Sequence, residues 1–244
     1  MEIIITTKSD KYNNWCVAGI STDNGRWIRP VRMGADDSLT DANLTCTNGH
    51  IAEVLDVIEI DIAPGNAVAL HPHQVENVFM DTTVSPRFVR RSTWNEVFAL
   101  HAPKRRNMIL NNNTKTVYGS DKMPATYVDQ LVNKKSIQLA KIRNLKINAC
   151  APGKNHPKAD FDYLSAKGEV LHYKLTVTDP EYAHNASRID HTDAHVIVSL
   201  AGEPYRGNCY YLLAAKIIPP EMRITAATSG LQTGGADPFE EPVH

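Results

Sequence analysis

Residues 15–31 read Trp-Cys-Val-Ala-Gly-Ile-Ser-Thr-Asp-Asn-Gly-Arg-Trp-Ile-Arg-Pro-Val, and this stretch decides the fold more than any other part of the 244-residue chain. Residues 15–21 and 26–31 are short runs rich in β-branched and aromatic side chains, which favour strands. Residues 22–25 separate them and end in Asn-Gly, the strongest short-range signal of a β-hairpin. The chain therefore opens with antiparallel β structure.

The second strand of this hairpin carries the strongest candidate for a binding surface. Side chains alternate along a strand, so Ile28 faces one way while Trp27 and Arg29 face the other. We expect Trp27 and Arg29 on an exposed face, where the ring would stack on a base for about 1–3 kcal/mol. The guanidinium would bind phosphate. The alternative is that Trp27 packs in the core and the arginines are solvated or paired with acids.

The remaining pattern predicts a mainly β protein with a few helices. Strand-like runs recur at 3–5, 53–62, 73–80, 136–147, 161–164, 170–178, 194–200 and 209–218. Residues 92–101, with Ser92 as N-cap, and residues 123–132 have helical patterns. Each β block has about the five strands of an OB-type barrel. We expect two OB-like barrels (1–86 and 136–220) joined by a basic helical connector (87–135), followed by a disordered tail (221–244).

Charge is distributed unevenly along the chain, although the formal net charge is only -1. Residues 1–86 carry 5 Lys and Arg against 12 Asp and Glu, and residues 147–244 carry 8 against 12. Residues 87–146 carry 13 against 3, a net charge of +10. Such a segment binds polyanions in an otherwise neutral molecule. The open alternative is that it neutralises the acidic flanks within the fold.

Several short motifs resemble the bacterial dual OB domain family. They are Cys-Val-Ala-Gly-Ile at 16–20 with Gly-Arg-Trp-Ile-Arg-Pro-Val at 25–31, Val-Thr-Asp-Pro at 177–180, Ser-Leu-Ala-Gly-Glu-Pro-Tyr at 199–205, and the run at 209–218. They occur in the expected order, and the resemblance spans residues 1–218. It implies two OB-like barrels and a nucleic-acid-binding role. It implies no known reaction and supplies no catalytic residues.

We therefore expect a module that binds nucleic acid, preferably single-stranded, or a nucleotide. The candidate binding residues are basic or aromatic: Arg26, Trp27, Arg29, Arg32, Arg87, Arg90, Arg91, Arg105, Arg106, Lys141 and Arg143. Two of them, Lys141 and Arg143, share a predicted strand face with apolar residues. This predicts that one or both are paired inside the fold.

Motifs for metal or covalent chemistry are weak in this sequence. The pair His71 and His73 and the pair His191 and His195 lack the further ligands of a zinc site, so we expect no metal and no cofactor. No nucleophile elbow, P-loop or dinucleotide-binding glycine motif occurs.

Two other function classes stay open. One is an enzyme acting on a nucleotide or nucleic acid, with His172, Asp179, His191 and Asp193 as its candidate catalytic residues. The other is a protein-interaction adaptor in a larger prokaryotic complex.

The cysteines and the apolar runs indicate the compartment. The four cysteines have no Cys-x-x-Cys spacing and sit beside small or apolar residues, so we expect reduced thiols in or near the core. The amino terminus lacks the features of a signal peptide, and no apolar run reaches the roughly 20 residues of a membrane span. The expectation is a soluble cytoplasmic protein without membrane contact.

Overall fold

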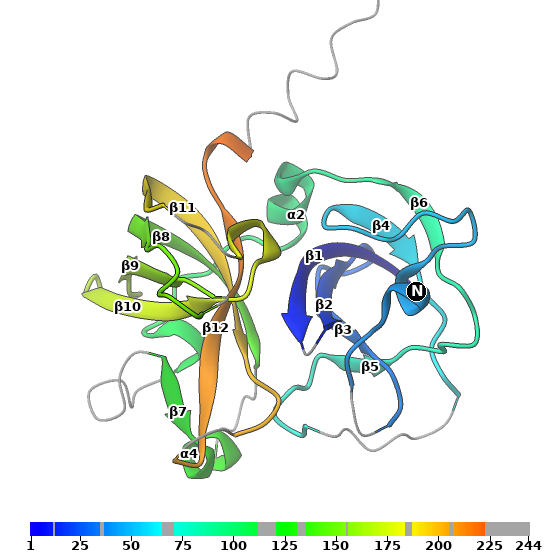
Figure 1. Cartoon of the computed structure of the whole chain (residues 1–244), viewed down its shortest axis with the longest axis horizontal. Coiled ribbons are helices and arrows are strands. Elements are labelled where there is room, and N and C mark those ends of the chain that lie inside the picture. Colours follow the sequence, from blue (N-terminus) through cyan, green and yellow to red (C-terminus); the bar gives the residue numbers. More distant parts are fainter. Residues whose placement is uncertain are drawn as a thin grey trace, which may run out of the picture.

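The computed structural model describes residues 1–11, 13–34, 37–64, 71–111, 121–130, 135–154, 156–183, 187–204 and 207–222. The tail expected to be disordered lies outside these residues from position 223 onward. Two β units lie side by side, with helix α2 (Trp94–Leu100) between them at the top of the view (Figure 1). The mainly β class predicted from the sequence is confirmed. None of the helices in the described residues is long and apolar enough to cross a membrane.

The first unit is a sheet with the strand order β5-β3-β2-β1-β4-β6. The strands are β1 (Glu2–Lys11), β2 (Asn14–Ser21), β3 (Trp27–Val31), β4 (Asp56–Glu59), β5 (Asn77–Phe79) and β6 (Arg87–Arg91), and α1 (Asp41–Leu44) follows β3. Only β3 and β5 run parallel. After β4, a bridge between Ile62 and Met80 joins the chain to the end of β5. With this bridge, the neighbours run in the cyclic order β1-β2-β3-β5-β4 and return to β1.

The second unit is a closed five-stranded barrel. Its strands are β8 (Ile137–Ile147), β9 (Lys158–Leu164), β10 (Val170–Val177), β11 (Ile189–Leu200) and β12 (Cys209–Ile218), with β7 (Lys122–Pro124) added at the edge of β12. The order is β10-β9-β8-β11-β12, and a parallel pairing of β10 with β12 closes the ring. The cycle matches that of the first unit. Both units thus have the strand connectivity expected of OB-like barrels.

Three apolar clusters hold these units together. One lies inside the second barrel, one inside the first, and the third lies between them and α2. Ile3 and Ile5 belong to the core of the first barrel, whereas Ile4 belongs to the cluster between the barrels. The unbroken apolar run at the start of the chain is therefore explained by a strand buried on both faces. The two barrels are therefore joined by an apolar cluster of their own.

The segment between the barrels contains less helix than expected. Strand β6 pairs with β4 and extends the first sheet, and β7 pairs with β12 and extends the second. Between them lie α2 and a 3-10 turn η1 (Ile109–Asn111), whereas α4 (Ala125–Gln130) follows β7. A second turn, η2 (Pro180–Tyr182), follows β10. A separate helical connector is not confirmed. Thr93 is the N-cap of α2, and the Ser92 expected there instead donates its hydroxyl to Glu96.

The predicted hairpin at the start of the chain is confirmed. Strands β2 and β3 pair antiparallel, and the Ser21 N–H donates to the carbonyl of Arg26 at 2.9 Å. Gly25 has a φ of 66°, and a Cβ there would lie 2.3 Å from the carbonyl oxygen of Leu100. Glycine is required here for its conformation and because the end of α2 packs directly on the turn.

Candidate functional site

Strand β3 presents Trp27 and Arg29 on the face opposite to Ile28, as alternation predicted. This face is covered by the second barrel and α2. Arg29 is only 3% exposed. Trp27 is half-buried, and its indole Nε1 donates to Nε2 of His101 at 3.1 Å. The expectation that Arg29 lies on an exposed phosphate-binding face is wrong, because the outer face of β3 is the surface on which the second barrel docks. Trp27 remains only partly exposed there.

Arg29 instead belongs to a buried polar joint between the barrels. Its Nη2 donates to the hydroxyls of Ser136 and Ser199, both at 3.1 Å. Ser136 in turn donates to the carboxylate of Glu76 from its backbone N–H (2.9 Å) and its hydroxyl (2.8 Å). The Ser136 hydroxyl therefore lies between the buried guanidinium of Arg29 and the buried carboxylate of Glu76, which both belong to the first barrel. Both charges are held by atoms of the second barrel.

Equivalent loops of the two barrels also meet. Nε2 of His73, in the loop between β4 and β5, lies 3.0 Å from the carbonyl oxygen of Ala201, in the loop between β11 and β12. The side-chain amide of Gln74 donates to the carbonyl of Leu200 at 3.1 Å. OB barrels bind ligands with the face of their second and third strands and with the loops 1–2 and 4–5. In this chain both 4–5 loops contact the other barrel.

The arginines of β6 are paired with acids of the same barrel or of α2. Burial would raise the pKa of the Asp56 carboxyl, but hydrogen bonds from His50 and Arg91 hold it below its usual value. The predicted binding residues on β6 therefore contribute little net positive charge. The ion pairs are Arg87 with Glu59 (2.6 Å), Arg90 with Glu96 (2.5 Å) and Arg91 with Asp56 (2.7 Å).

Lys141 and Arg143 point outward from β8, so the expectation that one or both are paired inside is wrong. Asn144 has a φ of 51°, and the register between β8 and β9 shifts around it. Before this bulge the even-numbered residues face the barrel core, and after it Leu145 and Ile147 do. The bulge reverses the phase of the strand. The charged residues therefore share no face with the apolar residues that follow them.

The outer surface of the second barrel carries two cross-strand rows of alternating charge. Arg143 pairs in register with Asp193 on β11 and with Asp162 on β9. Lys146 pairs in the same way with Asp190 and Asp160, and β10 continues the rows with Lys174 and His172. Opposite charges on neighbouring strands attract. With His172 neutral, the rows hold three cations and four carboxylates, so this part of the surface has no excess of positive charge.

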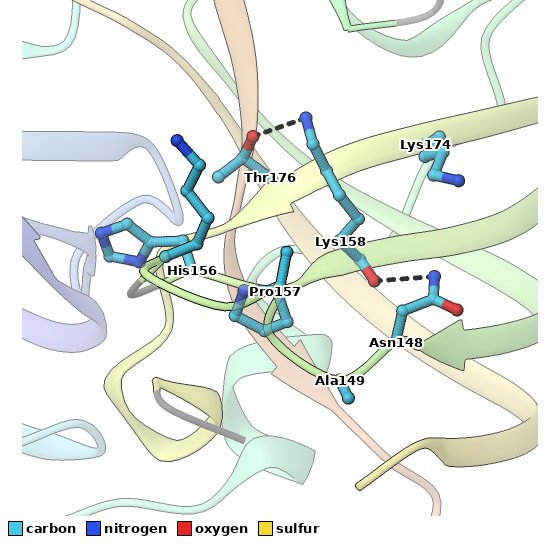
Figure 2. Close-up of a pocket in the computed structure, with 9 residues that line it drawn as sticks. Asn148, Ala149, His156, Pro157, Lys158, Lys174 and Thr176 are labelled. Carbon is cyan, nitrogen blue, oxygen red and sulfur yellow. Dashed lines mark hydrogen bonds between the residues drawn. The ribbon is translucent and has the colours of Figure 1, made fainter. Parts of the chain in front are cut away.

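Positive charge is concentrated at one end of these rows, in a groove of about 460 Å³ beside the loop between β8 and β9. We call it the loop groove. Figure 2 shows Lys158 reaching from β9 to Thr176 on β10, with His156 and Pro157 beside it. The lining residues are Asn148, Ala149, Ala151, Lys154, His156, Pro157, Lys158, Lys174 and Thr176.

The groove lining holds three lysines and a histidine but no carboxylate. Lys158 is held by Thr176 (2.8 Å) and by Asp121 (3.3 Å), which fixes its ammonium group at the edge of the groove. Among the described residues, Nδ1 of His156 is buried and has no hydrogen-bond partner. Lys154 is exposed on the loop. A ligand with an anionic group and a hydrogen-bonding group would find partners here.

The remaining predicted residues are scattered. Arg26 and Arg105 are exposed, and Arg32 and Arg106 are half-buried. The structure brings Arg105 and Arg106 to the turn of the β9–β10 hairpin, where the Arg106 N–H donates to the hydroxyl of Tyr163 at 2.6 Å. The arginines of β3 and β6 lie on the other barrel. These residues lie on both barrels and do not form one continuous basic surface.

The residues considered for catalysis do not converge. Asp179 is 1% exposed and lies 3.2 Å from Nζ of Lys216. Burial raises the pKa of the Asp179 carboxyl, although Lys216 and the Ile217 N–H act against this. This residue is part of a buried structural pair.

The two histidine candidates do share a hollow. His172 and His191 line a space of about 690 Å³ on the outer face of the second barrel. Nε2 of His172 lies 2.5 Å from Asp160 and Nδ1 lies 3.1 Å from Asp162, so both ring nitrogens are occupied. Asp193 is not in the lining. In the described part of the chain no group of three or more His, Cys, Asp and Glu is arranged to hold a metal ion.

The groove residues were missed at the level of sequence. Lys174 and Thr176 lie on the outer side of β10, where they alternate with buried residues. Outward lysines on a strand usually belong to a solvated face. Lys154 and His156 lie in a loop without periodicity, so no pattern tied them to the hairpin.

The comparisons with known proteins agree with the fold. A family model described as "Dual OB-containing domain" matches residues 1–217. None of the curated proteins matches the chain. The match extends from the first strand of the first barrel to the last strand of the second, so the chain belongs to the dual OB-containing domain family.

Proposed function

We propose that this protein binds single-stranded nucleic acid in the loop groove of its second barrel. The observation that carries the proposal is the groove itself, with Lys154, Lys158, Lys174 and His156 in its lining and no carboxylate among them. Phosphates supply the negative charge that these residues would contact. The ring of His156, in the groove lining, offers a flat surface for a base.

The position of the groove within the fold supports the same proposal. It lies on β9 and β10, the second and third strands of the closed barrel, and beside the loop between its first and second strands. OB barrels bind oligonucleotides on this face. In the first barrel the corresponding surface of β3 and the 4–5 loop contact the second barrel. The two barrels would then have different roles, one binding and one supporting.

Titration of the wild-type protein into labelled oligonucleotides tests this function. We expect saturable binding of a single strand of about twelve nucleotides, either DNA or RNA. Fluorescence anisotropy of the labelled strand measures this binding. The logarithm of the association constant should fall with the logarithm of salt concentration, by about 0.7 per phosphate contact. A duplex of the same sequence is the control and should bind more weakly. If no single strand binds at about 50 mM salt, the proposal fails.

A further inference from the structure

A second set of cations lies away from the loop groove, at the junction of the barrels. We call it the basic junction; it consists of Lys104, Arg105, Arg106 and Lys135. Three of the four are exposed and Arg106 is half-buried. Within the described residues, none of them forms an ion pair with a carboxylate. They differ in this from the arginines of β6, whose charges are all paired.

The basic junction is fixed to the turn of the β9–β10 hairpin. The hydroxyl of Tyr163 accepts from the Arg106 N–H and donates to the Arg106 carbonyl at 3.0 Å. The Ala166 N–H, in the turn, donates to the same carbonyl at 2.9 Å. His101 lies close by: burial lowers the pKa of its imidazole, and the charges of Lys104, Lys135 and Arg106 lower it further. Arg106 is therefore fixed at the hairpin turn by backbone contacts, with Lys104 and Arg105 next to it in the chain. Lys135 directly precedes Ser136 of the joint between the barrels.

The loop groove and the basic junction lie at opposite ends of the same hairpin. Lys158 and Thr176, at the groove, pair across one end, while Leu164 and Val170 pair next to the turn. Strand β9 has seven residues, so the two ends are about 20 Å apart. Between them lie the two rows of alternating charge, to one of which Lys174 belongs through its contact with Asp160 at 3.7 Å. Lys154 and Lys158 lie at the groove end, and the basic junction lies at the turn end.

From this arrangement we infer that the ligand is a strand of at least about four nucleotides that lies along the β9–β10 hairpin, with phosphates at both ends. The inference rests on the proposed function and adds the class of ligand. A free nucleotide would occupy the loop groove alone. A strand would use both positive ends and would therefore bind more tightly and with a steeper dependence on salt.

A length series combined with paired variants tests the inference. Oligothymidylates of about two, four, eight and twelve nucleotides are titrated with the wild-type protein over a salt series. The variant Lys104→Ala/Arg105→Ala removes two charges of the basic junction and leaves the Arg106 contacts intact. The matched control is Arg87→Ala/Arg90→Ala, which removes two exposed but ion-paired charges of β6.

We expect the longest strand to bind wild type at least about tenfold more tightly than the dinucleotide. The junction variant should lower the salt slope for the long strand by about 1.4, since each contact to a single strand contributes about 0.7. The control should keep the wild-type slope. Equal affinity for all lengths, with the same slope in both variants, would overturn the inference and leave the proposed function standing. Failure of wild type to bind any length would overturn both.

Discussion

Replacing Glu76 by alanine is expected to lower the free energy of unfolding by about 3–5 kcal/mol, because it leaves a buried cation without its compensating anion. Glu76 accepts two hydrogen bonds from Ser136, and the same serine accepts one from Arg29. The Ser136 N–H would lose its partner as well. Urea unfolding monitored by circular dichroism measures the change.

Two further variants separate the charge effect from simple loss of contacts. Arg26→Ala removes an exposed arginine next to the same strand and should change stability by no more than about 0.5 kcal/mol. Arg29→Met/Glu76→Met removes both buried charges and should cost less than Glu76→Ala alone, since apolar replacements of a buried pair are often tolerated. A loss of under about 1 kcal/mol for Glu76→Ala would contradict a charged joint between the barrels.

Neutralising the positive charge of the loop groove is expected to weaken the binding of a single strand about a hundredfold. The variant Lys154→Glu/Lys158→Gln removes two cationic donors, and a hydrogen bond to a charged group contributes about 1.5 kcal/mol. Glutamine at position 158 keeps a donor for Thr176, so the barrel should fold as before. Fluorescence anisotropy of a labelled oligonucleotide gives the affinity, and thermal unfolding checks the fold.

A control variant on the first barrel shows whether the loss of affinity is specific to the loop groove. Arg26→Glu/Arg87→Gln changes the net charge by the same amount on exposed residues far along the chain from the groove. We expect it to change affinity by less than about threefold, through long-range attraction alone. Equal losses in both variants would mean that binding depends on the overall charge and not on the loop groove.

Local patterns in the sequence predicted the strands, and they also predicted which side chains face a barrel core. Ile28 faces the core and Arg29 faces away from it, as alternation requires. What covers the far face was not predictable, since the hydroxyl that binds Arg29 lies 107 residues away on the other barrel. A strand pattern states which residues share a face, but it does not state whether that face meets water or another barrel.

The charge distribution shows the same limit. The positive middle segment was expected either to bind polyanions or to neutralise the acidic flanks, and the structure shows that some of its cations are paired with carboxylates. The arginines of β6 pair with acids, including Glu59 and Asp56 of the first barrel. Lys104 and Arg105 form no such pair among the described residues. Whether a cation of this segment has a carboxylate partner depends on tertiary contacts, and a count of charges along the sequence does not show these contacts.

On β8, the bulge at Asn144 made the prediction for Lys141 and Arg143 wrong. A strict alternation from residue 137 to 147 put Lys141 and Arg143 on the face of Leu145. One residue with a positive φ reverses the phase, and asparagine is among the few residues that tolerate it. The sequence contained a hint in Asn144, but nothing local required the bulge.

Photo-cross-linking tests most directly whether the second barrel carries the ligand. A single strand containing 5-iodouracil is bound to the wild-type protein and irradiated, and the modified peptides are identified by mass spectrometry. We expect cross-links to the peptide around His156 on the loop beside β9. Cross-links confined to the first barrel, around Trp27 or the strands β2 and β3, would contradict the assignment.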